Sequence, residues 1–162
     1  LARQKGKDEA VYDIAFTLQK FVLVDKAKDP VYEPLVKKVE RLVREWRNRK
    51  IDEREAYERL LSLVDEASEL EKREKELGLP RPAFFILSTL ERKLGKSETL
   101  LKEIKALWST LENSGKLFPG WNRRLSALKE VMREIRKYLR KKLPLEEREE
   151  VQNEIFKGLK EI

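Results

Sequence analysis

The fold is decided most clearly by the stretch from Leu117 to Leu143, which reads LFPGWNRRLSALKEVMREIRKYLRKKL. It joins an aromatic turn to a long helical pattern. The apolar residues of that pattern recur every three or four positions, at Leu125, Leu128, Met132, Ile135, Leu139 and Leu143. This spacing puts them on one face of an α-helix, so the stretch predicts an amphipathic helix over about 122–143.

The same periodicity extends through the rest of the chain. It predicts further helices over roughly 8–24, from about 34, from Asp52 to Gly78, over 83–94, from Ser97 to about Gly115, and from 145 onward. The inward residues of the helix that begins at Asp52 are expected to be Tyr57, Leu60, Leu61, Val64 and Ala67. No stretch alternates as a strand does. We therefore expect an all-α fold, a bundle of about seven helices without a sheet, as a single helical domain over 1–162.

The composition excludes several classes of chemistry. The 162 residues include no His and no Cys, which excludes Ser-His-Asp and Cys-His sites, His- or Cys-ligated zinc, iron–sulfur clusters and disulfides. The chain has no Gly-rich phosphate loop, and its carboxylate pairs lie among many Lys and Arg. We expect no catalytic residue, no metal, no cofactor and no small-molecule substrate.

The chain carries no signal of secretion or membrane insertion. No apolar run approaches the roughly 20 residues of a membrane span, and the N-terminus lacks a signal-peptide pattern. We expect a cytoplasmic protein with no membrane partner. Because the chain starts at Leu1 rather than Met, we also expect it to be a C-terminal part of a longer polypeptide.

Positive charge is concentrated in the quoted stretch. From Lys116 to Leu143 there are ten Lys or Arg and two Glu, a balance of +8, whereas the whole chain carries +7. An electrostatic function is therefore expected here. The candidate contacts to nucleic acid or an acidic partner are Arg123, Arg124, Lys129, Arg133, Arg136, Lys137, Arg140 and Lys141. The alternative is a solvated basic face without a ligand, with the last cations complementing the helix dipole.

The three tryptophans have two interpretations. Trp46 and Trp108 fall on apolar helical stripes, which favours core packing. Trp121 lies in the turn beside Phe118, where we expect it to cap the bundle. The alternative is an exposed aromatic side chain at Trp121 that could stack on bases.

Two segments resemble a known family. The segment DPVYEPLVKKVERLVREWRNRKIDEREAYERLLSLVDEASELEKREKELGL, Asp29 to Leu79, has an Asp-Pro-Val start, a long helix, an Ile-Asp junction and a Glu-rich helix. LFPGW and the basic helix from Trp121 to Pro144 follow in the same order. Together they resemble the C-terminal helical region of the restriction subunit of type I restriction–modification enzymes.

The resemblance implies an assembly role. The full subunit would carry a nuclease domain and two ATP-driven motor domains, and this region would help to dock the motor onto the methyltransferase and specificity subunits near DNA. Our first hypothesis is therefore a non-catalytic assembly domain that also contacts DNA through the helix over 122–143. The competing hypotheses are an autonomous basic helical nucleic-acid-binding module and a helical protein-interaction scaffold without nucleic-acid contact.

Overall fold

The structure is a computed structural model that describes residues 12–14, 16–18 and 29–162. These residues form helices joined by short connections, and no strand occurs among them. The prediction of an all-α fold of about seven helices is confirmed. The predicted helix over 8–24 lies largely outside the described residues; within it, 12–14 and 16–18 are helical.

The chain divides into two compact units, Leu1–Gly78 and Leu79–Ile162. Each unit is described by itself below. A single domain over 1–162 stays a prediction. No helix in the described part of the chain is long and apolar enough to cross a membrane.

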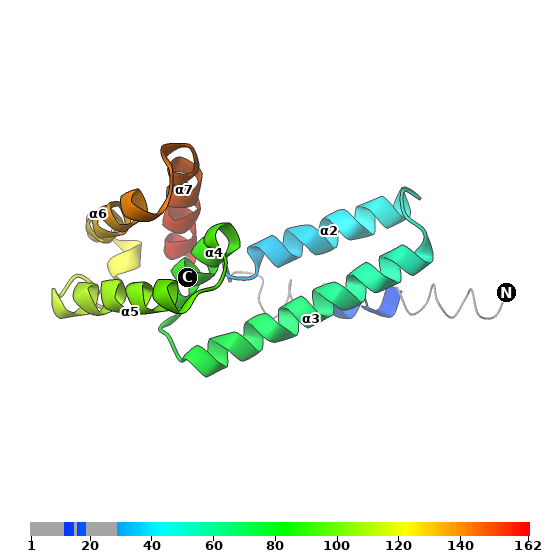
Figure 1. The fold of residues 1–162 in the computed structure, drawn as a ribbon, viewed down its shortest axis with the longest axis horizontal. Coiled ribbons are helices and arrows are strands. Elements are labelled where there is room, and N and C mark those ends of the chain that lie inside the picture. Colours follow the sequence, from blue (N-terminus) through cyan, green and yellow to red (C-terminus); the bar gives the residue numbers. More distant parts are fainter. Residues whose placement is uncertain (1–11, 15, 19–28) are drawn as a thin grey trace. The chain divides into compact units, whose positions relative to one another are not determined.

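The first unit contains a helical hairpin of α2 (Glu33–Arg47) and α3 (Glu53–Leu77), which lie side by side in Figure 1. The Asp52 carboxylate accepts a hydrogen bond from the Glu55 backbone N–H at 2.8 Å and so caps the start of α3. Gly78 ends α3 with a left-handed φ of 58°. These are the start and stop positions that the sequence predicts.

The buried face of α3 differs from the predicted one. Leu60 and Ala67 are buried as expected, but Leu61 is 40% exposed. Ala56 and Leu63 are buried instead, because the spacing 56, 60, 63, 67 keeps one side of α3 toward α2. Leu61 and Val64 line a groove of about 440 Å³ together with Ile14 and Leu18.

The second unit contains α4 (Arg81–Leu94), α5 (Glu98–Asn113), the 3-10 helix η2 (Trp121–Arg123), α6 (Leu125–Lys142) and α7 (Leu145–Glu161). Helix α4 contacts α5 and α7, and α6 contacts α7 and η2. The large apolar side chains of α4 that are fully buried are Phe84, Phe85, Ile86, Leu87 and Leu90. Helix α4 has more buried residues than any other described helix of this unit and so lies at the centre of its core.

A side-chain amide from η2 caps the C-terminal end of α7 in the second unit. The Asn122 NH₂ group donates hydrogen bonds to the backbone carbonyls of Leu159 at 3.0 Å and Ile162 at 3.3 Å. These carbonyls belong to the last turn of α7, where no further helical N–H is available to them. Asn122, in the middle of η2, thereby fixes the end of the last helix.

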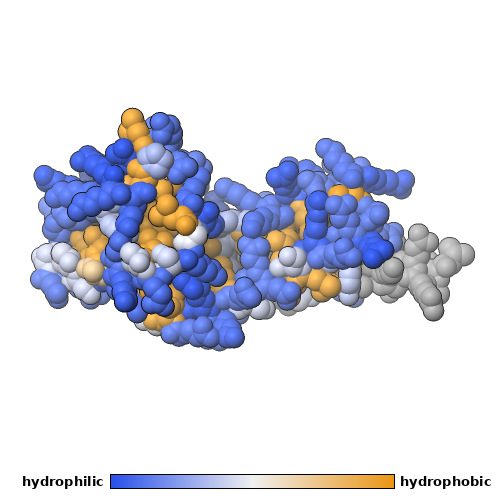
Figure 2. All heavy atoms as spheres, in the orientation of Figure 1, coloured by the Kyte–Doolittle hydropathy of each residue, from blue (hydrophilic) through white to orange (hydrophobic). Residues whose placement is uncertain are grey.

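Hydrophilic side chains cover most of the face drawn in Figure 2, and apolar residues occupy smaller areas between them. This follows from a composition with 41% charged residues. Exposed charge alone therefore does not single out a binding surface in this protein. A useful criterion is whether each charge is neutralised by a neighbour of opposite sign.

Candidate nucleic-acid interface on α6

Helix α6 begins later than the sequence predicts. The predicted start is about 122, but residues Trp121–Arg123 form a 3-10 turn and Arg124 is extended, with φ −107° and ψ 114°. The α-helix therefore starts at Leu125. An extended residue between the two elements lets the chain change direction before α6.

Trp121 is a core residue. Its side chain is 8% exposed, and its ring meets that of Trp108 edge-on, with the ring centroids 6.0 Å apart. The alternative that Trp121 is exposed for base stacking is wrong, because η2 turns the side chain into the second unit. The expected capping role agrees with this burial.

The inner face of α6 holds the helix in the second unit. Leu128, Val131, Met132, Ile135 and Leu139 are each at most 1% exposed. Leu125, which the sequence places on this face, is 53% exposed. At 100° per residue Leu125 and Val131 both lie roughly 60° from the centre of the buried set, on opposite sides of it, so the second unit covers the Val131 side and leaves Leu125 exposed. Val131 is a core residue that the three-four spacing did not include.

Four cations form one continuous stripe along one solvent-facing flank of α6. Lys129, Arg133, Arg136 and Arg140 are spaced by four, three and four residues, so they lie above one another on the helix. The stripe spans about 16 Å of helix axis at 1.5 Å per residue. All are exposed except Arg136, which is partly buried. We call these residues the cationic stripe.

No carboxylate neutralises the cationic stripe within the described part of the chain: none of its side chains makes an ion pair there. Lys137, by contrast, lies on the neighbouring side of α6 and pairs with Glu134 at 3.3 Å. Glu134 also approaches Lys116, at 3.7 Å. The hydrogen bond from Lys137 lowers the pKa of Glu134, so this carboxylate stays ionised and offsets the charge of Lys137.

The end of α6 is tied to α5 through Glu103. The Lys142 ammonium donates to this carboxylate at 2.7 Å, and the Tyr138 hydroxyl donates to its other oxygen at 2.6 Å. The hydrogen bond from Lys142 lowers the pKa of Glu103 most, and the hydrogen bond from Tyr138 lowers it further. Burial and the adjacent Glu103 raise the pKa of Tyr138. These bonds fix the rotation of α6 about its axis and keep the cationic stripe on the outside.

The remaining candidates lie at the two ends of α6. Arg124 stacks over the ring of Phe118, with its guanidinium carbon 5.8 Å from the centroid. Arg123 and Lys141 are exposed, and neither makes an ion pair with another described residue. The structure therefore groups Lys129, Arg133, Arg136 and Arg140, and separates them from the paired Lys137. The i, i+3 spacing of Glu134 and Lys137 was the available sequence signal for that difference.

The net charge belongs entirely to the second unit. Residues 1–78 contain 18 Lys or Arg and 18 Asp or Glu, whereas residues 79–162 contain 19 and 12. The second unit therefore carries the +7 of the whole chain. No cluster of three or more His, Cys, Asp or Glu side chains in the described ranges is placed to hold a metal ion.

Comparison with known protein families gives a match over most of the chain. The model of the family described as "Type I restriction enzyme HindI endonuclease subunit-like, C-terminal" matches residues 19–162. The match includes both segments that resemble the type I restriction subunit. No curated protein and no solved structure matched the chain. Since the family model covers most of the sequence, the chain belongs to this family, as the C-terminal domain of a type I restriction enzyme endonuclease subunit.

Proposed function

We propose that this chain is a non-catalytic assembly domain, which docks its endonuclease subunit onto the methyltransferase and specificity subunits and contacts DNA phosphates through α6. The observation that carries the DNA contact is the cationic stripe of Lys129, Arg133, Arg136 and Arg140, whose charges meet no carboxylate among the described residues. The docking role rests on membership of the type I restriction family.

The chemistry of the stripe suits a phosphate backbone. Three of its four cations are arginines, whose planar guanidinium groups donate paired hydrogen bonds to phosphate oxygens. Unneutralised cations on DNA release condensed counterions, and this release supplies affinity without reading sequence. A cation already paired with a carboxylate, such as Lys137, must first give up that partner and so gains less.

The fixed position of α6 adds to the proposal. Its inner face is filled by core residues, and Glu103 holds its last turn against α5. The helix therefore presents the stripe in one orientation before any ligand arrives. A preorganised surface loses less conformational entropy on binding than a mobile basic tail does.

The DNA contact is tested by the salt dependence of duplex binding. The variant K129Q/R133Q/R136Q/R140Q removes the stripe, and Gln keeps the helix propensity close to that of Lys and Arg. Four lost phosphate contacts should flatten the slope of log K against log salt by about 3.6, at roughly 0.9 per contact. Fluorescence anisotropy with a labelled duplex at several salt concentrations measures this slope.

The control variant is K37Q/R54Q/K72Q/K75Q. Each of these exposed cations pairs with a Glu four residues away on its own helix. Both variants have the same net charge, +3 instead of +7. We expect the control variant to keep nearly the slope of the natural sequence. Equal slopes for both variants would mean that general charge, rather than the stripe, governs binding, and would contradict the proposal.

The docking role has a separate test. The chain should retain the methyltransferase and specificity subunits of its own type I system in a pull-down at a salt concentration that abolishes duplex binding. Electrostatic contacts with phosphate weaken steeply with salt, whereas a packed protein interface does not. Failure to retain these subunits at any salt concentration would contradict docking and leave the DNA contact as an independent function.

A further inference from the structure

The turn between α2 and α3 contains an unusual backbone conformation. Arg49 is the one non-glycine residue in the described ranges with a positive φ, 55°. Its N–H donates to the carbonyl of Trp46 at 3.0 Å, and the next N–H, of Lys50, donates to that of Glu45 at 2.9 Å. This pair of bonds is the Schellman ending of a helix, in which glycine is the favoured residue at the position of Arg49.

Helix α5 ends with the same pair of bonds, and there the residue is a glycine. Gly115, with φ 76°, donates to Glu112 at 3.1 Å, and Lys116 donates to Leu111 at 3.3 Å. The left-handed position of this helix ending is therefore occupied by glycine after α5 and by arginine after α2. The left-handed conformation is unfavourable for a residue with a Cβ. Such strain is concentrated at functional positions, which directs attention to the Arg49 side chain.

Arg49 belongs to a cluster of four cations. Arg44, Arg47, Arg49 and Lys50 are all exposed, and none pairs with a carboxylate in the part of the chain that the structure describes. We call them the turn cluster. The dipole of α2 favours cations in its last turn, where Arg44 and Arg47 lie. It does not require a cation in the left-handed position, because those two residues already supply the charge.

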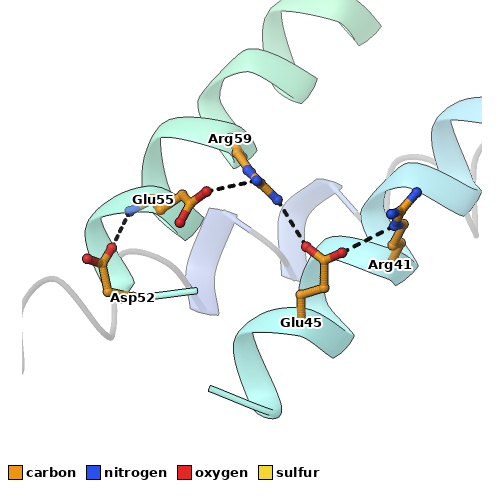
Figure 3. Close-up of polar contacts among 5 residues, drawn as sticks. All are labelled: Arg41, Glu45, Asp52, Glu55 and Arg59. Carbon is orange, nitrogen blue, oxygen red and sulfur yellow. Dashed lines mark hydrogen bonds and ion pairs between the residues drawn. The ribbon is translucent and has the colours of Figure 1, made fainter. Parts of the chain in front are cut away.

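The nearest carboxylates are engaged elsewhere. Figure 3 shows Glu45 between two arginines: it accepts from Arg41 at 3.2 Å and from Arg59 at 3.0 Å. Glu55 accepts from the same Arg59 at 2.8 Å, and Asp52 caps the first turn of α3. These bonds hold the acidic groups along the hairpin. They leave the turn cluster as an unneutralised patch on a unit whose formal charges sum to zero.

We infer that the turn cluster is a second contact with the phosphate backbone of duplex DNA. The inference rests on the proposed function, since membership of a restriction endonuclease family makes DNA the relevant polyanion. Three of the four residues are arginines, which bind phosphate oxygens in pairs. The left-handed backbone places Arg49 and Lys50 beyond the end of α2, while Arg44 and Arg47 remain on its last turns.

Arg49 offers a substitution whose effects on folding and on binding should have opposite directions. Arg49→Gly relieves the backbone strain, so the melting temperature of the full chain should rise. It also removes one cation, which should weaken duplex binding at 0.1 M salt by about eightfold if one phosphate contact is lost. Arg49→Lys keeps the charge and should bind duplex nearly as the natural chain does. A higher melting temperature with unchanged duplex affinity for Arg49→Gly would overturn the inference.

The same measurement separates this inference from the proposal for α6. The variant R44Q/R47Q/R49Q/K50Q is compared with the stripe variant, the control variant and the combination of stripe and turn substitutions. We expect the slopes of log K against log salt to flatten additively in the combination. If only the turn variant flattens the slope, the proposal for α6 fails and this inference stands. If only the stripe variant does, the turn cluster makes no DNA contact.

Two further outcomes overturn the inference. A turn variant that binds duplex like the natural chain but no longer retains the methyltransferase or specificity subunit would assign the cluster to a protein partner. A natural chain that shows no salt-dependent duplex binding would remove both DNA contacts. Circular dichroism of each variant confirms that a changed slope does not come from lost helix.

Discussion

At the scale of single residues, Gly158 marks a close approach between α7 and α4. Gly158 lies inside α7, and a Cβ built on it would be 2.1 Å from Cζ of Phe85. Phe85 is 1% exposed, so its ring has little room to move away. Gly158 is therefore the residue that permits these two helices to approach each other.

We predict that Gly158→Ala destabilises the protein. The added methyl group overpacks the core at a cost of about 1–3 kcal/mol, while the gain in helix propensity returns roughly 1 kcal/mol. The net loss should be about 1 kcal/mol, measured by urea unfolding. Asn153→Ala is the control, because Asn153 is exposed on the same helix and should gain slightly in stability. Adding Phe85→Leu to Gly158→Ala should recover part of the loss; no recovery would contradict the steric explanation.

Single residues also mark the limit of what the sequence predicts. Gly78 and Gly115 follow helical patterns, and their role as helix ends is readable from position alone. Gly158 lies within a continuous pattern, and only the packing of α7 on α4 explains it. The positive φ of Arg49 could not be predicted from the sequence, because residues other than glycine rarely adopt this conformation.

At the scale of elements, the bond between α5 and α6 depends on the ionisation of Glu103. This carboxylate accepts from Lys142 and Tyr138, and its pKa is lowered in the folded state. A lowered folded pKa means that the stabilisation is complete above the unfolded pKa of about 4.3 and is lost as the pH falls through the folded value. The hydrogen bonds from Lys142 and Tyr138 of α6 to Glu103 of α5 are therefore present at neutral pH.

We predict that Glu103→Gln lowers the stability at pH 7 by about 1 kcal/mol, a modest value because the pair is only half-buried. The difference between the two proteins should stay constant from about pH 5 to 8 and shrink below about pH 4. Melting temperatures across this range measure it. Glu112→Gln on the same helix is exposed and unpaired among the described residues, so it should show no such change. A difference that grows toward low pH would refute the assignment.

Helix ends were easier to predict than helix faces. Asp52, Ser97 and Gly78 act through local hydrogen bonds or local φ values, so they can be read from neighbouring residues. Which leucine points inward depends on a neighbouring helix. Leu61 and Leu125 match the periodic pattern yet are exposed, because the partner helices cover Leu63 and Val131 instead. A three-four spacing defines a face only to within one position on either side.

At the scale of the whole molecule, the sequence shows where positive charge is concentrated, but it does not show which of these cations pair with carboxylates. The local excess of Lys and Arg predicts a basic helix over 122–143. Among the described residues, the cations that pair with Glu134 and Glu103 are Lys137, Lys116 and Lys142. The pairing with Glu103 joins residues 39 positions apart, which no local pattern reveals. The turn cluster is hidden in the sequence because 18 cations and 18 anions cancel over residues 1–78.

This charge distribution leads to a last prediction, about pH. The chain contains no His and no Cys, and the proposed phosphate contacts are all Lys or Arg, residue types whose ordinary pKa values lie above about 10. At constant ionic strength, duplex affinity should therefore vary by less than about twofold from pH 6 to 9. Anisotropy titrations of the N-terminally acetylated chain measure this, since acetylation removes the α-amino group, which titrates near pH 8. A step in affinity with a midpoint inside this range would require a titrating group at the interface. Neither the cationic stripe nor the turn cluster contains one, so such a step would place the DNA contact on another surface of the molecule.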